Sequence, residues 1–474
     1  MVLFNKITNL DEFKGIFLIP VFETTSKNIV PIEFNGVSVY SQVFYGKKDT
    51  QYLVEKYECT HVFIGLGKKA EYKSLKTIFR RVASKNIESF GKDTVLVIPE
   101  NFSKLDVEAA ISGLMLGTYN LGHFKKKDQH PFLKSDFELK VFSKFDFDDA
   151  ILKGLKIGNA QLETYKLVDL PSNIVTPKYL ANWAIEAGKK FGFSTEVFDR
   201  KKCQEIGLHS FLAVGQGSER EPQFIIMDYN PTNYKKHIGL VGKGITFDTG
   251  GLNIKVAGMV HMKCDMAGGG AVLGAMQLIA DLKLPYRVTA IVPACENSVD
   301  AKSFLPSDVI NSYSGSTIEI IDTDAEGRLI LADGLSYLIK NYKPETVIDI
   351  ATLTGSSVAT FGFECGALFT NDDDLSKKLQ QSGDAIGERL WPLPLWDSYH
   401  SDIESEIADV KNYSGKPVAG AISAAKFLEH FTNKHTSWAH LDVAGVAFGD
   451  DEFAKTKHAT AFGVHLITNF IENL

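Results

Sequence analysis

Three carboxylates and an arginine stand close together in residues 321–329, whose sequence is Ile-Asp-Thr-Asp-Ala-Glu-Gly-Arg-Leu. The acids are Asp322, Asp324 and Glu326, and apolar residues flank the segment on both sides. Crowded carboxylates beside a buried strand repel one another and lose hydration, so a positive partner must neutralise them. A metal ion or the amino end of the following helix could do so. An exposed loop with capping acids is the alternative, and matching ligands elsewhere decide between the two.

Such acids occur upstream, in two glycine-rich segments. Asp248 and Asp265 stand there among small and apolar residues, where a carboxylate needs a partner. Oxygen-rich acidic sites suit divalent ions such as magnesium, manganese and zinc. Together with Asp324 and Glu326, these two acids would offset the charge of two divalent cations. Charge balance therefore predicts a two-metal hydrolytic centre.

Three cations, Lys243, Lys255 and Arg328, remain beside this charge-balanced centre. A lysine next to metal ions is expected to lose its proton, and it can then be a ligand itself. Arg328 stays protonated, so its guanidinium is expected to hold an anion or a polarised oxygen. Cys264 adjoins Asp265, but neighbours on a strand point in opposite directions, so we do not expect the thiol to be a ligand.

Length and composition indicate an ordinary globular protein. The chain has 474 residues, enough for two or three domains, with 44% hydrophobic and 23% charged residues. Its net charge of −7 argues against nonspecific nucleic-acid binding. Five scattered cysteines suggest neither a disulfide framework nor a zinc site of the CxxC kind. No signal peptide and no apolar run of about 20 residues is found, so we expect a soluble, cytoplasmic protein without a membrane partner.

Hydrophobic periodicity predicts two α/β domains, a smaller one over residues 1–149 and a larger, catalytic one over residues 171–474. A helix over residues 150–170 is expected to connect them, and the charged stretch over residues 125–149 marks the boundary. Strands and helices alternate in the smaller domain, with strands predicted over residues 61–66 and 94–99 and helices over residues 72–85 and 106–121.

The larger domain also alternates, which predicts a mixed, largely parallel central sheet with helices on both faces. Strands are expected over residues 224–227, 238–241, 288–292, 318–321 and 347–351, and helices over residues 267–282 and 328–340. Ligands gather at the carboxyl ends of strands in such sheets. Asp248, Asp324 and the loop over residues 352–355 each follow a predicted strand, so we expect them to share one site.

These motifs closely resemble those of the leucyl aminopeptidase (cytosol aminopeptidase) family. The family signature Asn-Thr-Asp-Ala-Glu-Gly-Arg-Leu corresponds to residues 322–329, with Asp322 in place of asparagine. Further similar segments lie at residues 241–255, 262–269, 294–297, 349–355, 407–412 and 438–442, with a fainter match at residues 65–69. The resemblance implies an enzyme that releases N-terminal amino acids, with a leucine-type preference, from peptides with a free N-terminus.

The resemblance also implies a set of ligand residues for each of two metal ions. One divalent ion, zinc or manganese with magnesium as a further candidate, would be held by Lys243, Asp248, Asp265 and Glu326. The second would be held by Asp248, Asp324 and Glu326, so that Asp248 and Glu326 bridge the pair. A hydroxide between the two metals would attack the peptide carbonyl. Lys255 would polarise that carbonyl, and Arg328 would hold a bicarbonate ion that acts as general base. The family resemblance further predicts a homohexamer.

Two features concern specificity. The pocket for the substrate side chain is expected at Met262, Thr352, Gly355, Ala444 and Ala447. Ala447 stands where the family commonly has a bulkier methionine, which predicts room for larger side chains.

The departure at Asp322 leaves two hypotheses open: the extra acid shifts metal preference or pH optimum, or it is a harmless acid outside the ligand shell.

Other enzyme classes find less support. The chain has no His-Glu-x-x-His and no Gly-x-Ser-x-Gly motif, and His261 and His440 are expected to be core or supporting residues. Residues 268–274 loosely match a dinucleotide loop, which makes a nucleotide-dependent enzyme the first alternative. A scaffold or DNA-binding relative without catalysis is the second, although all seven expected site residues are present.

Overall fold

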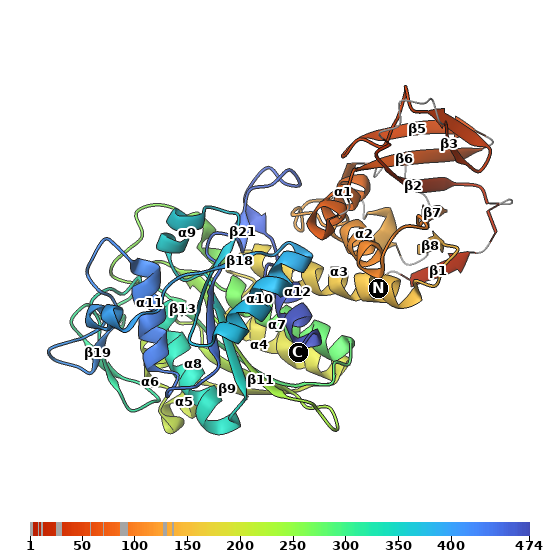
Figure 1. The fold of residues 1–474 in the computed structure, drawn as a ribbon. Coiled ribbons are helices and arrows are strands. Elements are labelled where there is room, and N and C mark those ends of the chain that lie inside the picture. Colours follow the sequence, from red (N-terminus) through yellow and green to blue (C-terminus); the bar gives the residue numbers. More distant parts are fainter. Residues whose placement is uncertain are drawn as a thin grey trace. The chain divides into compact units, whose positions relative to one another are not determined.

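The computed structural model describes residues 3–7, 9–10, 13–24, 31–56, 58–69, 71–85, 93–126, 130–134 and 137–474. The chain divides into two compact units, Met1–Leu162 and Glu163–Leu474. Each unit combines a sheet with helices (Figure 1), and the predicted α/β class is confirmed. Helix α3 (Asp148–Asp169) continues from the first unit into the second.

The first unit is built on a six-stranded sheet of order β1-β8-β7-β2-β6-β5. Its neighbouring strands are parallel except for β5 and β6, which pair antiparallel. The strands are β1 (Leu3–Ile7), β2 (Ile16–Phe22), β5 (Gln51–Lys56), β6 (Cys59–Gly67), β7 (Thr94–Val97) and β8 (Glu138–Phe142), beside a hairpin of β3 (Pro31–Phe34) and β4 (Val37–Tyr40).

Two helices pack against each other in the first unit, α1 (Tyr72–Lys85) and α2 (Lys104–Leu116). α1 has the predicted bounds, whereas α2 begins and ends earlier than the predicted range of 106–121. The start is set by Ser103, whose side chain accepts the N–H of Asp106 while the Asp106 carboxylate accepts the N–H of Ser103. This reciprocal capping satisfies two amide groups that the helix itself leaves unpaired.

The second unit contains a mixed sheet of order β18-β17-β20-β16-β11-β13-β10-β9, with β12 paired to β13. The central strands β20, β16, β11 and β13 run parallel, whereas β17, β10 and β9 are antiparallel to their inner neighbours. The strands are β9 (Ser194–Phe198), β10 (Gln223–Tyr229), β11 (His237–Gly242), β12 (Gly244–Asp248), β13 (Arg287–Asn297), β16 (Thr346–Ala351), β17 (Gly366–Thr370), β18 (Leu390–Pro392) and β20 (Trp438–Asp442).

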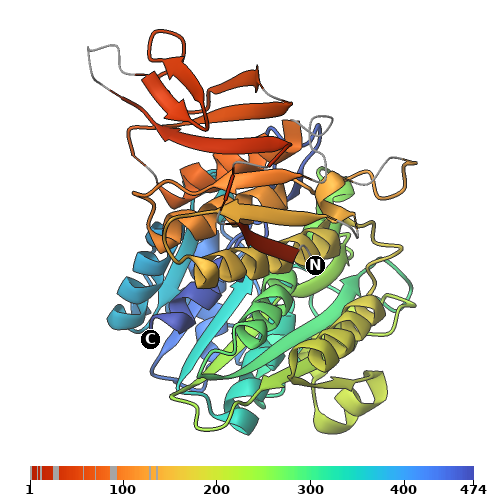
Figure 2. The ribbon, with the colours of Figure 1, turned by 90° about the vertical axis from the view of Figure 1, so that its right-hand side faces the viewer.

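Helices cover both faces of this sheet (Figures 1 and 2). On β11, a side chain at Gly239 would meet Leu338 of α8 (Gly327–Tyr342), and one at Gly242 would meet Gly268 of α7 (Ala267–Asp281). Positions three apart on a strand face opposite sides, so α7 and α8 lie on opposite faces. The other helices are α4 (Pro177–Phe191), α5 (Arg200–Ile206), α6 (His209–Gly215), α9 (Gly355–Phe361), α10 (Asp373–Ile386), α11 (Gly420–His430) and α12 (Val464–Glu472).

One predicted strand of the central sheet is wrong. Instead of a strand over residues 318–321, β15 (Thr317–Glu319) belongs to a small sheet with β14 (Val309–Asn311) and β19 (Val410–Lys411). The apolar residues after β15 bond elsewhere, since the Ile320 N–H reaches the Asp308 carbonyl and the Ile321 N–H reaches the Asn412 side chain. β21 (Phe448–Gly449) and β22 (His458–Ala459) form a short hairpin. No helix within the described residues is long and apolar enough to cross a membrane.

Candidate metal centre

Loops at the carboxyl edge of the central sheet bring the predicted ligands together. Lys243 stands between β11 and β12, and Asp248 is the last residue of β12. Asp265 directly follows the 3₁₀ helix η3 (Met259–Cys264) and precedes α7. Asp324 and Glu326 lie in the turn that leads into α8. Carboxylate oxygens of Asp248, Asp324 and Glu326 lie within 4.8 Å of one another, close enough to share a metal ion.

Lys243 connects the remaining acid to this group. Its Nζ lies 2.9 Å from Asp265 Oδ1, 2.9 Å from Glu326 Oε1 and 3.0 Å from the Thr352 carbonyl oxygen. The lysine side chain passes so close to α8 that a Cβ at Gly327 would come within 2.5 Å of it. Burial alone would lower the pKa of the Lys243 amine, but Asp265 and Glu326 raise it above its usual range. The glycine in the signature therefore leaves space for the amine beside the acids.

Lys255 approaches from the other side of the group. Its Nζ lies 2.7 Å from Asp248 Oδ2 and also pairs with the Asp324 carboxylate. Burial would lower the pKa of this amine, but Asp248 and Glu326 raise it above its usual range. The Lys255 side chain is 18% exposed, so its amine borders both the acids and solvent. A group placed in this way can donate to a ligand that enters from solvent.

Two lysine ammonium groups serve four carboxylates, so the paired lysines neutralise the acids only in part. Burial raises the pKa of the Asp324 carboxyl to about 7, and repulsion from Asp248 and Glu326 adds to the rise. Burial likewise raises the pKa of Asp265 and of Glu326. Within the described residues, Asp265 Oδ2 and Glu326 Oε2 are buried without a hydrogen-bond partner. Buried, unpartnered carboxylate oxygens fit a divalent cation, which would supply the missing positive charge.

Arg328 is the second residue of α8 and is 5% exposed. Its Nη1 donates to the Asn412 carbonyl oxygen at 2.8 Å, while Nε has no partner within the described part of the chain. Burial lowers the pKa of this guanidinium to about 10. A buried cation with an unused donor can hold a small anion.

Three residues that sequence reasoning gave no role support the ligands. The Asn297 amide donates to Asp248 Oδ1 at 2.8 Å and to the Thr323 carbonyl at 3.0 Å. Asn412 accepts the N–H of Ile321, and its amide donates to the Asp322 carbonyl. Asp442, the last residue of β20, accepts N–H groups of the loop that follows β16. Asn297, Asn412 and Asp442 fall inside the motifs quoted above, but only folding shows what each side chain contacts.

Of the five residues expected to line the substrate pocket, Thr352 directly contacts an acid of the centre. Thr352 donates from Oγ1 to Asp265 Oδ1 at 2.9 Å, and Met262 belongs to η3. A Cβ added at Gly355 would meet no atom within 4 Å, so this position borders open space. Ala444 is partly exposed, whereas Ala447 is only 3% exposed and its backbone is bonded to Val443.

Cys264, His261 and His440 were not expected to be metal ligands. Burial raises the pKa of the Cys264 thiol to about 12, so it stays protonated. His440 is fully buried and its Nδ1 lies 2.5 Å from Asp349 Oδ1, as a core histidine would. His261 packs its ring against Phe448.

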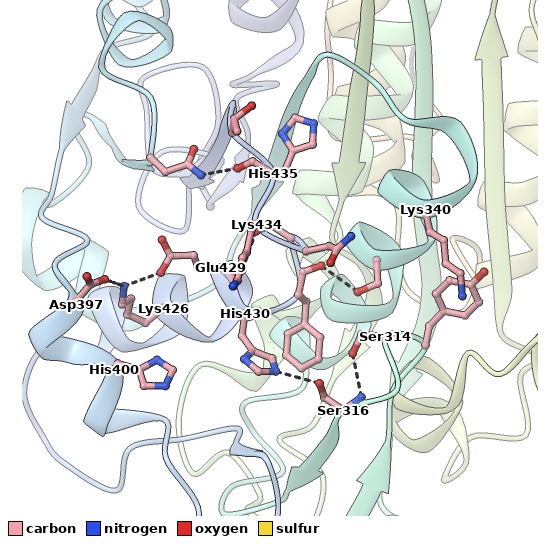
Figure 3. A pocket seen from close by; sticks show the side chains of 17 residues that line it. Ser314, Ser316, Lys340, Asp397, His400, Lys426, Glu429, His430, Lys434 and His435 are labelled. Carbon is pink, nitrogen blue, oxygen red and sulfur yellow. Dashed lines mark hydrogen bonds and ion pairs between the residues drawn. The ribbon is translucent and has the colours of Figure 1, made fainter.

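A separate cavity of about 970 Å³ lies at the opposite, amino edge of β16 and β20, and no predicted site residue lines it. Its lining includes Lys340, Lys426, Glu429, His430, Lys434 and His435. Figure 3 shows Lys426 between Asp397 and Glu429, with Nζ–O distances of 3.3 and 2.6 Å. No buried polar atom of this lining lacks a partner within the described residues, in contrast to the acids of the metal centre.

An α/β sheet with a buried, carboxylate-rich centre at its carboxyl edge describes a class of hydrolytic metalloenzymes. Residues 163–468 match the model described as "Cytosol aminopeptidase family, catalytic domain". The chain belongs to this family, and the predicted resemblance is confirmed.

Individual relatives agree with this assignment. A probable cytosol aminopeptidase of Chlorobaculum tepidum is 48% identical over 322 residues, which span 68% of this chain and 64% of that protein. One of Protochlamydia amoebophila is 36% identical over 486 residues, covering 97% of this chain and 96% of its own length. Among solved structures, the bottromycin maturation enzyme BotP in complex with Mn has a TM-score of 0.84 and 26% identity, covering 97% of this chain and 99% of its own.

Proposed function

We propose that this chain is a metal-dependent aminopeptidase that removes N-terminal residues, with a leucine-type preference, from peptides with a free N-terminus. The observation that carries the proposal is the convergence of Asp248, Asp324 and Glu326 within 4.8 Å, beside the Lys243–Asp265 pair. Family membership supports the activity, and the manganese complex of BotP supports a divalent metal.

Two divalent cations, zinc or manganese, would be held by these residues. Lys243, Asp248, Asp265 and Glu326 would serve one ion, and Asp248, Asp324 and Glu326 the other. Lys243 would serve as the neutral amine, because the positive charge of a bound ion would lower the pKa that the acids alone raise. When bound, the ions would lower the pKa of water and polarise the scissile carbonyl. The unpartnered oxygens of Asp265 and Glu326 support this assignment, because a buried carboxylate oxygen requires a positive or donor partner.

The chain's own cations would then act on the substrate. Lys255 would turn from its carboxylate partners to donate to the oxygen of the scissile carbonyl, where negative charge develops. Arg328 would hold a bicarbonate ion through its free Nε, and this anion would carry the proton from water to the leaving amine. Both roles agree with the positions of the two residues, because Lys255 borders solvent and Arg328 lies in the interior.

We also propose a role for each part of the chain, a set of pocket residues and an oligomeric state. Residues 171–474 would form the catalytic domain, with residues 1–149 as a separate domain and residues 150–170 as the helix between them. Met262, Thr352, Gly355, Ala444 and Ala447 would line the pocket for the first side chain of the substrate. The enzyme would act as a homohexamer in the cytoplasm, as the names of its relatives suggest for location.

The test is metal analysis combined with hydrolysis of leucine anilide. After chelation we expect less than one metal per chain and no hydrolysis. Adding manganese or zinc is expected to restore both two bound ions per chain and the activity. The proposal would be defeated if neither manganese nor zinc restored hydrolysis. It would also be defeated if the chelated protein kept its full activity.

A further inference from the structure

Asn297 joins the two halves of the proposed metal centre. It is the last residue of β13, it pairs with Asp248 at the end of β12, and its side chain is 0% exposed. We propose that Asn297 is a positioning residue that sets which oxygen Asp248 presents and fixes the Asp324 turn against it. This inference rests on the proposed two-metal function and adds a residue that is not itself a ligand.

The Asn297 amide group contacts both segments at once. Nδ2 donates to Asp248 Oδ1 at 2.8 Å and to the Thr323 carbonyl oxygen at 3.0 Å, one residue before Asp324. The Asn297 backbone is fixed as well, because its carbonyl accepts both the N–H and the hydroxyl of Thr249 at 2.9 Å. A single buried side chain thus connects β12 to the turn that leads into α8.

The chemistry of this position requires an amide. Two oxygens face the side chain, so only its NH₂ end can lie between them, and the reverse orientation would place oxygen against oxygen. The other end, Oδ1, is buried without a partner within the described residues. A buried acceptor without a partner lowers the stability of the fold. The two hydrogen bonds that Nδ2 donates offset this loss.

These bonds determine which carboxylate oxygen of Asp248 is available to a metal ion. Its Oδ1 accepts from Asn297 and from the Gly250 N–H at 2.9 Å, whereas Oδ2 pairs with the Lys255 amine, which also pairs with Asp324. With Oδ1 occupied by donors, Oδ2 is held toward the space between the carboxylates. Outer partners of this kind fix the orientation of metal-binding carboxylates, and their loss commonly costs about 10–100-fold in metal affinity.

The test is manganese titration of the full-length protein by calorimetry for the wild type, Asn297→Ala and Asn297→Ser. Thr289→Val is the matched control, because Thr289 is a fully buried residue of the same strand whose hydroxyl donates to Asp228, far from the acids. We expect Asn297→Ala to weaken at least one manganese site about 10–100-fold. Asn297→Ser keeps one hydrogen-bond donor and leaves a smaller void than Asn297→Ala. It is therefore expected to lose less manganese affinity.

Thr289→Val is expected to lower thermal stability while binding manganese as the wild type does. Excess manganese is expected to restore hydrolysis in Asn297→Ala, which a general packing defect would not allow. Wild-type manganese affinity in both Asn297 variants would overturn this inference alone. Absence of manganese binding by the wild type would overturn the proposed function, and this inference with it.

Discussion

Oδ1 of Asp322 accepts a hydrogen bond from the backbone N–H of Asp324, with 2.8 Å between nitrogen and oxygen. This is a turn in which a side chain bonds the backbone two residues on. Asn412 holds the backbone of the same turn through the N–H and carbonyl of Asp322. The acid that replaces the family's asparagine therefore shapes the turn of a proposed ligand, and an amide oxygen could accept the same bond.

The first prediction concerns this turn. Asp322→Asn is expected to keep the hydrogen bond, so manganese affinity and the pH profile of hydrolysis should match the wild type. Asp322→Ala loses the acceptor and is expected to bind manganese about tenfold more weakly, as other outer-shell losses do. Calorimetry and pH–rate profiles check both variants. A shifted pH optimum in Asp322→Asn would instead favour the hypothesis that the extra charge tunes the centre.

The second prediction concerns Lys255. Its amine pairs with Asp248 and Asp324, and we propose that it donates to the scissile carbonyl during hydrolysis. Lys255→Ala is expected to lower kcat by about 10²–10³-fold, the usual loss for one oxyanion donor. Metal content should stay at two ions per chain, because Lys255 is not a proposed ligand. Lys302→Ala, at an exposed lysine, is the control and should keep wild-type kcat. Loss of metal in Lys255→Ala would assign the lysine a different role.

The third prediction concerns the pocket for the substrate side chain. A Cβ at Gly355 meets no atom within 4 Å, so a larger side chain there enters open space without displacing the fold. Gly355→Leu is expected to lower kcat/KM for leucine and phenylalanine anilides more than for alanine anilide. The thermal unfolding temperature should change little. Equal losses on all three substrates would mean that Gly355 does not line the pocket.

The fourth prediction concerns pH and stability. Asp333 is fully buried and accepts N–H groups from Phe211 and Tyr313 at 2.9 and 2.7 Å. Burial raises the pKa of its carboxyl from 3.8 to about 7, against the opposing effect of these bonds. Protonation therefore favours the folded state, and this contribution is full below about pH 4 and lost as pH rises through about 7.

Thermal unfolding of the wild type and Asp333→Asn checks this sign. The variant cannot ionise, so the unfolding temperature of the wild type should fall relative to the variant between about pH 4 and about pH 7. A difference that stays constant over this range would show that the Asp333 carboxyl does not titrate there.

Much of the second unit could be predicted from the sequence because its signals are local. The apolar runs before residue 242 and before residue 352 correspond to β11 and β16, and the glycine-rich run after Asp265 corresponds to α7. Charge balance also grouped Asp248 with Asp324 and Glu326, since buried acids must have a common counter-charge.

Other features depend on contacts between distant segments. The isoleucines after β15 look like part of a strand, but their amides bond to Asp308 and Asn412. Asn297 and Asn412 carry no charge and show no periodicity, so their bonds to the ligand segments became visible only in the folded chain. The same holds for Gly327, whose missing side chain makes room for Lys243.

The central claim is that the chain cleaves at a free N-terminus through its metal centre. Its most direct test compares one leucine-starting peptide in unblocked and N-acetylated form, digested by the manganese-loaded protein and followed by mass spectrometry. We predict stepwise loss of single N-terminal residues from the unblocked peptide and none from the acetylated one. Equal cleavage of both forms, or internal cuts in either, would contradict the account.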